Sequence, residues 1–255
     1  MKKIISGFVI LVTIVMSCDK TDTIPERYTA IPGANTNIKF LNMSPGSPQI
    51  NFFANSTKAS AIASASSGAE AGIIYNSSYP APIGYATLPS GSIKIDAVVP
   101  AASTVMPGAT IMSTTQAFDA TKFYTLVMLD TFTKATPLVV QDDPTVPDAT
   151  KAYFRVANFL ASAPVKVEIS KTSAGYPYSK TFASLGSKTV LAYDSLGAGS
   201  GQLYKILLRN AATDARLDSI INFTPAMAKK YTFYVRGGVA TTGTTRPLIG
   251  SYTNF

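Results

Sequence analysis

Short segments of alternating hydrophobicity, interrupted by proline and glycine, constrain the fold of this chain more than any other feature. In residues 93–99 and 231–236, apolar side chains occupy every second position. A period of two places alternate side chains on opposite faces of a β-strand. Pro and Gly cluster between such runs, at 44–48, 88–91 and 196–199, where strands must turn. The pattern predicts an all-β protein of antiparallel, immunoglobulin-like or transthyretin-like sandwiches.

A weak internal repeat divides the chain into two halves of similar design. Four pairs of segments keep their order along the chain: 39–43 with 155–159, 88–92 with 196–200, 124–127 with 231–234, and 137–139 with 247–249. An ordered set of matches is harder to obtain by chance than any single one. We therefore expect two tandem sandwiches of about seven strands, at residues 38–142 and 151–255. Residues 143–150 would be a proline-containing, semi-rigid linker.

The first half also resembles a known bacterial family. An opening strand is followed by Asn42-Met43-Ser44-Pro45 with Pro48, then by Leu88-Pro89-Ser90-Gly91 and by the segment Lys122-Phe123-Tyr124-Thr125. These motifs are similar to those of the domain of unknown function 4397 family, and the second half departs from them at 160–164 and 196–197. The resemblance implies an exported all-β protein of Bacteroidetes or other bacteria, often a lipoprotein, with adhesion as one suggested role. It supplies no catalytic residues.

Cys18 is the only cysteine, and it directly follows a segment that resembles a lipoprotein signal peptide. Lys2 and Lys3 precede an apolar stretch that is too short to span a bilayer, which takes roughly 20 residues. We expect residues 1–17 to be removed, Cys18 to be acylated, and 18–37 to form a flexible tether. The alternatives are an ordinary secretory peptide and a buried free thiol. The prediction places the protein in the cell envelope, at the outer membrane, with the membrane face left open.

The composition argues against several kinds of chemistry. The chain has no histidine, so it cannot build Ser-His-Asp or Cys-His arrangements or histidine metal sites. The segment 197–201 is glycine-rich but lacks the Lys-Ser/Thr ending and following helix of a phosphate-binding loop. The 22 basic residues exceed the 14 acidic ones, but they are spread singly along alternating segments, as on solvated strand faces. We expect no enzyme activity, no cofactor and no nucleic-acid partner.

Three carboxylates near the expected linker are a weak candidate calcium site. Asp142, Asp143 and Asp148 lie among prolines, and calcium between two sandwiches would stiffen them into a rod. Calcium usually gathers six to eight oxygen ligands, which three carboxylates do not supply by themselves. A solvated linker without metal is the favoured interpretation.

Tyrosines in loop-like segments are the candidate ligand contacts. Tyr75, Tyr79, Tyr176 and Tyr178 lie among hydroxyl and amide side chains, and exposed tyrosine rings stack on sugars. Tyrosine is equally a normal strand residue, so a structural role is the competing interpretation.

The sequence thus favours a lipid-anchored envelope protein with a non-enzymatic binding, adhesive or structural role. One alternative is a glycan-binding surface lipoprotein that assists a nutrient importer. Another is a fimbrial-type subunit that polymerises by strand exchange. The expected partners are the membrane, through the lipid, and a glycan or an envelope protein.

Overall fold

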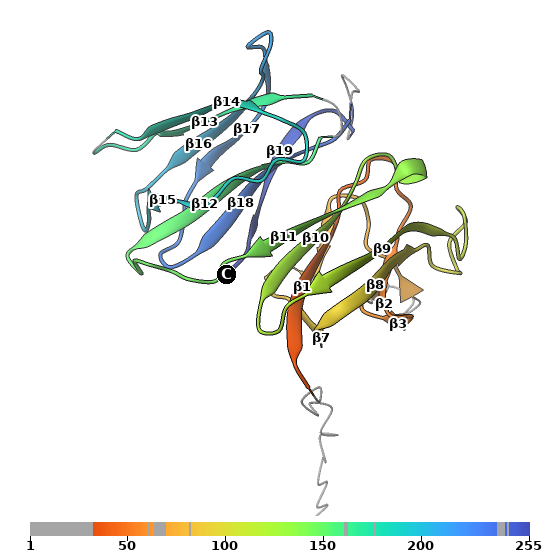
Figure 1. Cartoon of the computed structure of the whole chain (residues 1–255). Helices are drawn as coiled ribbons and strands as arrows, with labels where there is room; N and C mark the ends of the chain where they lie inside the picture. Colours follow the sequence, from red (N-terminus) through yellow and green to blue (C-terminus); the bar gives the residue numbers. More distant parts are fainter. Residues whose placement is uncertain are drawn as a thin grey trace, which may run out of the picture. The chain divides into compact units, whose positions relative to one another are not determined.

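The described part of the chain consists almost entirely of β-strands. The computed structural model describes residues 33–60, 62–63, 70–81, 83–160, 163–175, 177–238, 243 and 245–255. Within these ranges the one helical element is a short 3-10 helix, η1 (Phe132–Lys134), and no helix has the length and apolar character needed to cross a bilayer. The all-β prediction is confirmed (Figure 1). Cys18 and the expected signal and tether lie outside the described residues.

The first sandwich pairs a five-stranded sheet with a four-stranded one. The larger sheet has the order β11-β10-β1-β6, with β7 also paired to β1, and the smaller has the order β3-β2-β8-β9. Phe40 of β1 and Phe52 of β2 stack across the core between them, with ring centroids 4.7 Å apart. The strands are β1 (Asn35–Asn42), β2 (Asn51–Ala54), β3 (Thr57–Lys58), β6 (Ser77–Tyr79), β7 (Ala86–Pro89), β8 (Gly91–Val98), β9 (Thr110–Phe118), β10 (Phe123–Leu129) and β11 (Thr136–Asp142), with a separate ribbon of β4 (Ile62–Ala63) and β5 (Glu70–Ala71).

The second sandwich pairs two four-stranded sheets. Their orders are β15-β12-β18-β19 and β14-β13-β16-β17. Phe154 of β12, Val167 of β13 and Phe233 of β18 belong to the core between them. The strands are β12 (Lys151–Asn158), β13 (Val165–Lys171), β14 (Ser179–Leu185), β15 (Asp194–Gly197), β16 (Tyr204–Asn210), β17 (Arg216–Phe223), β18 (Lys230–Arg236) and β19 (Leu248–Thr253).

Both sandwiches use one strand order. The path β11-β10-β1-β7 corresponds to β19-β18-β12-β15, and β3-β2-β8-β9 corresponds to β14-β13-β16-β17. One feature differs from the predicted antiparallel sheets, because β1 runs parallel to β10 and β12 runs parallel to β18. The first strand of each sandwich therefore pairs with a strand late in the same half. Such a long-range partner leaves no local turn signal in the sequence.

Equivalent side chains make equivalent hydrogen bonds in the two sandwiches. The Asn42 side-chain oxygen accepts a hydrogen bond from the Ser44 backbone N–H at 3.3 Å, and its amide nitrogen donates to the Ile73 carbonyl at 3.1 Å. Asn158 likewise accepts from the Leu160 N–H at 3.0 Å and donates to the Leu185 carbonyl at 2.9 Å. Each asparagine satisfies backbone groups where the chain leaves the first strand.

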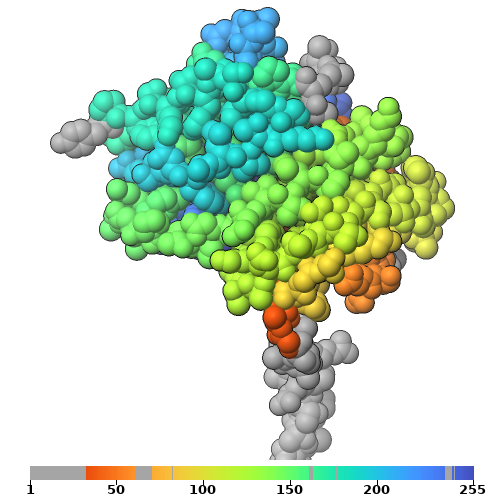
Figure 2. Space-filling view, in the orientation of Figure 1, coloured from red at the N-terminus to blue at the C-terminus, as the bar shows by residue number. Residues whose placement is uncertain are grey.

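A third apolar cluster lies between the two sandwiches. Leu41 of β1, Val127 of β10 and Tyr234 of β18 are among its buried members. These side chains point away from the core of their own sandwich, so β1, β10, β12 and β18 are buried on both faces. The alternation in 231–236 is typical of a strand with one buried face, but the other face of this strand is covered by the first sandwich. Residues 33–255 consequently form one compact unit, in which the two sandwiches are in direct contact (Figure 2).

Candidate functional site

A buried polar network lies beside the apolar cluster between the sandwiches. The side chains of Asp142, at the end of β11, and Arg155, on β12, are 0% and 4% exposed and form a salt bridge. Asp142 also accepts hydrogen bonds from the hydroxyls of Thr125, at 2.5 Å, and Tyr85, at 2.9 Å. Arg155 donates from Nε to the Thr232 hydroxyl at 2.9 Å. A buried ion pair is tolerated when such additional hydrogen bonds satisfy its remaining atoms.

The network is built from the same positions in both sandwiches. Lys39 pairs with Thr125 across β1 and β10, as Arg155 pairs with Thr232 across β12 and β18. The Thr232 hydroxyl donates to the Asn254 side-chain oxygen at 2.7 Å, as Thr125 donates to Asp142. The two sandwiches thus meet through the same face, as the subunits of a twofold dimer do. The two halves of the network differ in that the first sandwich has an acid, Asp142, where the second has an amide, Asn254.

Aromatic rings cover the two equivalent cations. The Lys39 ammonium lies 5.2 Å from the Tyr85 ring centroid and 5.9 Å from that of Tyr252. The Arg155 guanidinium lies 4.9 Å from the Tyr193 ring centroid. Such cation–π contacts partly replace the water that burial removes. Burial lowers the pKa of Lys39 to about 8, although the nearby Asp142 charge opposes this shift.

Lys39 makes the stability of the protein depend on pH. Because its pKa falls from 10.5 to about 8 on folding, the unfolded chain binds more protons between these values. Stability contributed by Lys39 therefore rises with pH across this window, at up to about 1.4 kcal/mol per pH unit. Burial raises the pKa of Tyr85 and of Tyr193, which opposes the trend once tyrosine ionises in the unfolded chain.

We expect Lys39→Met to reduce the rise in unfolding free energy between pH 8.0 and about 9.5, below the ordinary tyrosine pKa of about 10. Urea denaturation at three pH values in this range measures the slope. Lys94→Met, at an exposed lysine of β8, is the matched control and should keep the wild-type slope. Equal slopes for Lys39→Met and the wild type would contradict the assignment.

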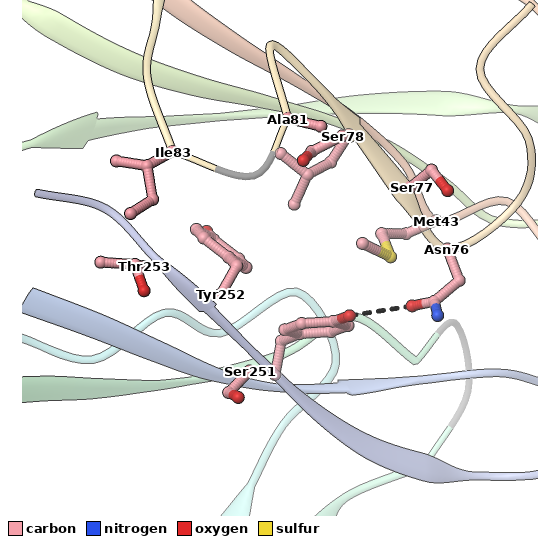
Figure 3. Close-up of a pocket in the computed structure, with 11 residues that line it drawn as sticks. Met43, Asn76, Ser77, Ser78, Ala81, Ile83, Ser251, Tyr252 and Thr253 are labelled. Carbon is pink, nitrogen blue, oxygen red and sulfur yellow. Dashed lines mark hydrogen bonds between the residues drawn. The ribbon is translucent and has the colours of Figure 1, made fainter. Parts of the chain in front are cut away.

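An open pocket of about 600 Å³ lies at one edge of the junction, the region where the two sandwiches meet (Figure 3). Its wall from the second sandwich consists of Tyr234, Ser251, Tyr252 and Thr253. Its wall from the first sandwich consists of Leu41, Met43, Asn76, Ser77, Ser78, Ala81 and Ile83. None of these lining residues is charged. The pocket therefore combines apolar side chains and two tyrosines with hydroxyl and amide groups.

The position of Tyr234 in the pocket is fixed by two neighbours. Its hydroxyl donates to the Asn76 side-chain oxygen at 2.8 Å, which joins β18 to the turn before β6 (Figure 3). Gly250 pairs with Tyr234 across β18 and β19, and a Cβ atom at Gly250 would lie 2.7 Å from the Tyr234 ring. Glycine at this position thus lets the ring lie against β19.

The three predicted tyrosines that the structure describes do not assemble into one site. Tyr79, on β6, packs against the first core, and the Tyr75 hydroxyl accepts a 3.4 Å hydrogen bond from Arg236 beside the junction. Tyr178 packs against the second core, edge-on to Tyr204 with centroids 5.8 Å apart, and burial raises its pKa to about 12. Tyr176 lies outside the described residues. Tyr75 and Tyr79 flank the pocket-lining residues 76–78 in sequence, whereas Tyr178 belongs to another core.

The candidate calcium ligands have separate structural roles. Asp142 is buried in the salt bridge with Arg155, so it is not solvated as the favoured interpretation expected. Asp143 accepts from the Thr145 N–H at 2.9 Å and lies 3.4 Å from the Lys230 ammonium. Asp148 accepts from the Thr150 N–H at 2.9 Å. Across the described ranges, no three His, Cys, Asp or Glu side chains come together as a potential metal site.

Sequence reasoning missed the residues that form the junction. Lys39, Arg155 and Lys230 are at most 3% exposed, although scattered basic residues suggested solvated strand faces. The prediction of solvated faces holds for 165–169, where Lys166 and Glu168 pair at 2.9 Å on a partly exposed face. The available signal for the junction was the repeat itself. Lys39 and Arg155 occupy equivalent positions in the two copies, and Thr125 and Thr232 occupy a second pair of equivalent positions.

Comparisons with known proteins identify a family. A family model described as a domain of unknown function, DUF4397, matches residues 36–169. This range covers the first sandwich, the linker, β12 and most of β13. No curated protein matches the sequence. A crystal structure from Bacteroides ovatus, of a protein described as a candidate adhesin, aligns with 81% of this chain and 89% of its own at 11% identity, with a TM-score of only 0.21.

Proposed function

The chain belongs to the DUF4397 family, whose function is unknown, and we propose that it is a lipid-anchored cell-envelope protein with a non-enzymatic binding or adhesive role. The observation that carries the binding role is the open, uncharged pocket at the junction of two sandwiches that share a buried face. Clefts between packed domains are common ligand sites. We also propose that the second sandwich is a further copy of the family domain, because it repeats the strand order of the first.

The described ionisable groups near the junction stabilise the contact between the sandwiches and do not point to catalysis. Asp142 is engaged by Arg155, Thr125 and Tyr85, and it does not line the pocket. A catalytic carboxylate must reach a substrate in a cleft, and the pocket lining contains no carboxylate. Binding without turnover is the role that this arrangement supports best.

The binding role is tested with residues 19–255 immobilised through the N-terminal end. Neutral and acidic oligosaccharides and purified envelope proteins are passed over the surface, and the eluted material is analysed by mass spectrometry. We expect reversible retention of at least one ligand, recovered unchanged. Recovery of a chemically altered ligand would replace the binding role with an enzymatic one.

The anchor is tested by Cys18→Ala in the full chain. Two or three acyl chains hold a protein on a membrane almost permanently, at about 0.8 kcal/mol per buried methylene. We expect the wild type to sediment with membranes after a high-salt wash and Cys18→Ala to appear in the supernatant. Ser17→Ala is the matched control and should remain with the membranes. A Cys18→Ala protein that still sediments would sink the lipoprotein assignment.

The second candidate function is a glycan-binding lipoprotein that works beside a nutrient importer. The pocket favours it, because aromatic rings next to hydroxyl and amide groups suit sugars. In this second candidate the sugar contacts would be Tyr234 and Tyr252, which line the pocket, and not Tyr178, which packs against the second core.

A further inference from the structure

The junction pocket has a counterpart at the other end of the shared face. Ser78 of β6 pairs with Leu41 on β1, and Val190 forms an isolated bridge with Ala157 on β12. Leu41 and Ala157 are equivalent, since each lies two residues after the cation of its own copy. Ser78 and Val190 therefore hold the same place at opposite ends of the junction.

The counterpart positions are apolar where the pocket is polar or aromatic. By the same strand pairing, Tyr234 corresponds to Val127, because they lie two residues after Thr232 and Thr125 respectively. Tyr252 corresponds to Val140, because Tyr252 pairs with Thr232 and Val140 pairs with the equivalent Thr125. One end of the shared face thus carries valines at the positions where the other carries serine and tyrosine.

The counterpart end, which we call the closed end, is held by apolar packing and an ion pair. Val190 packs against the interdomain apolar cluster together with Leu138. The Lys188 ammonium adds a 2.8 Å salt bridge to Asp130, in the turn between β10 and β11. Lys188 corresponds to Asn76, and both have positive backbone φ angles, of 59° and 64°. The same backbone conformation therefore presents the Lys188 ion pair at one end and the pocket-lining Asn76 amide at the other.

This difference shows that the two ends of the shared face are built from different kinds of side chain. The chain keeps hydroxyl, amide and phenol groups at the open end, whereas the closed end has valines, of which Val127 and Val190 pack in the interdomain cluster. One large apolar side chain of the pocket remains in water, since Ile83 is 49% exposed. Apolar side chains that stay exposed beside polar ones are typical of a ligand site.

From this comparison we infer that the open end of the junction binds a neutral carbohydrate of one or two sugar rings. The inference rests on the proposed binding role and names its ligand. The tyrosines and Ile83 offer apolar surface to the faces of a sugar ring, and Ser77, Ser78 and Thr253 offer hydroxyls to its edge. The Asn76 amide, oriented by its bond to Tyr234, adds a donor. The lining has no Lys or Arg, so it offers no ion pair to a sulfated or sialylated sugar.

The inference is tested by screening residues 19–255 on an array of neutral, sialylated and sulfated glycans. Calorimetry then measures affinity for soluble neutral disaccharides such as maltose, cellobiose and lactose. Ser78→Val copies the closed end and should weaken binding about tenfold or more, as loss of one polar partner in a sugar site does. Ala81→Trp, at an exposed residue of the rim, should block the pocket without disturbing a core. Thr115→Val, on the exposed face of β9, is the matched control.

Thermal unfolding of each variant separates loss of binding from loss of folding. Neutral-glycan binding that is weakened by both pocket variants at unchanged melting temperature supports the site and its ligand. Neutral-glycan binding that both variants retain would move the site elsewhere and leave the binding role intact. Binding of sulfated or sialylated glycans alone, or of envelope proteins alone, would overturn the ligand class only. A protein that retains no ligand of any kind would overturn the proposed function as well.

Discussion

Replacing Asp142 with alanine is expected to destabilise the protein by about 3–5 kcal/mol, the usual cost of leaving one partner of a buried ion pair alone. The substitution would leave the Arg155 side chain, which is 4% exposed, without its ion-pair partner. It would also remove the acceptor for the Thr125 and Tyr85 hydroxyls. Urea denaturation measures the change. Because the chain has no tryptophan, unfolding is followed by far-ultraviolet circular dichroism.

Two further variants give this result its meaning. Asp148→Ala removes an exposed carboxylate that lies in the linker, and it should cost less than about 1 kcal/mol. Asp142→Leu combined with Arg155→Met removes both charges, and it should recover much of the stability that Asp142→Ala loses. A loss below about 1 kcal/mol for Asp142→Ala would show that the pair is solvated in the folded protein.

The second large effect is expected for Leu41→Ala, at about 2–4 kcal/mol. Leu41 lies in neither sandwich core, but it is completely buried in the cluster between them. Its loss would leave a cavity against the second sandwich, so the cost should match that of a core leucine. Ile221→Ala, at a 65% exposed residue of β17, removes similar apolar surface and should change stability by less than about 0.5 kcal/mol. A similarly small change for Leu41→Ala would mean that the face between the sandwiches is open to water.

The sequence predicted the parts of the fold that depend on local patterns. Alternation in 93–99 places Ile93, Ile95 and Ala97 in the first core, as expected for a strand with one buried face. The all-β class follows from such segments, because the period of a strand and the residues of a turn can both be recognised within a short stretch of sequence. The parallel pairing of β1 with β10 could not be read in the same way, because it joins segments more than 80 residues apart.

The junction was beyond the reach of the sequence for a related reason. A lysine between apolar residues, such as Lys39 between Ile38 and Phe40, is typical of a strand with one solvated face. Only a second sheet packed on that face buries Lys39, and the nearby acid, Asp142, directly precedes the segment predicted to be the linker. The same applies to the pocket, whose walls come from loops and from both interior and edge strands of the two halves.

Tyrosine illustrates why composition alone does not locate a site. The loop-like setting of Tyr178 suggested a ligand contact, yet its ring packs against the second core. Tyr234 and Tyr252 sit in an ordinary alternating strand and near the C-terminal end, and they line the pocket because β18 and β19 face the first sandwich. Residues 76–78, next to the predicted Tyr75 and Tyr79, are the part of the proposed site that sequence reasoning approached most closely.

Scanning calorimetry of residues 19–255 and of the Leu41→Ala variant tests most directly whether the two sandwiches form one body through their shared face. We expect a single transition for each protein, with equal calorimetric and van't Hoff enthalpies, and a shift of the whole transition to lower temperature in the variant. Two separate transitions, one of them unmoved by Leu41→Ala, would contradict the shared face and the pocket that depends on it.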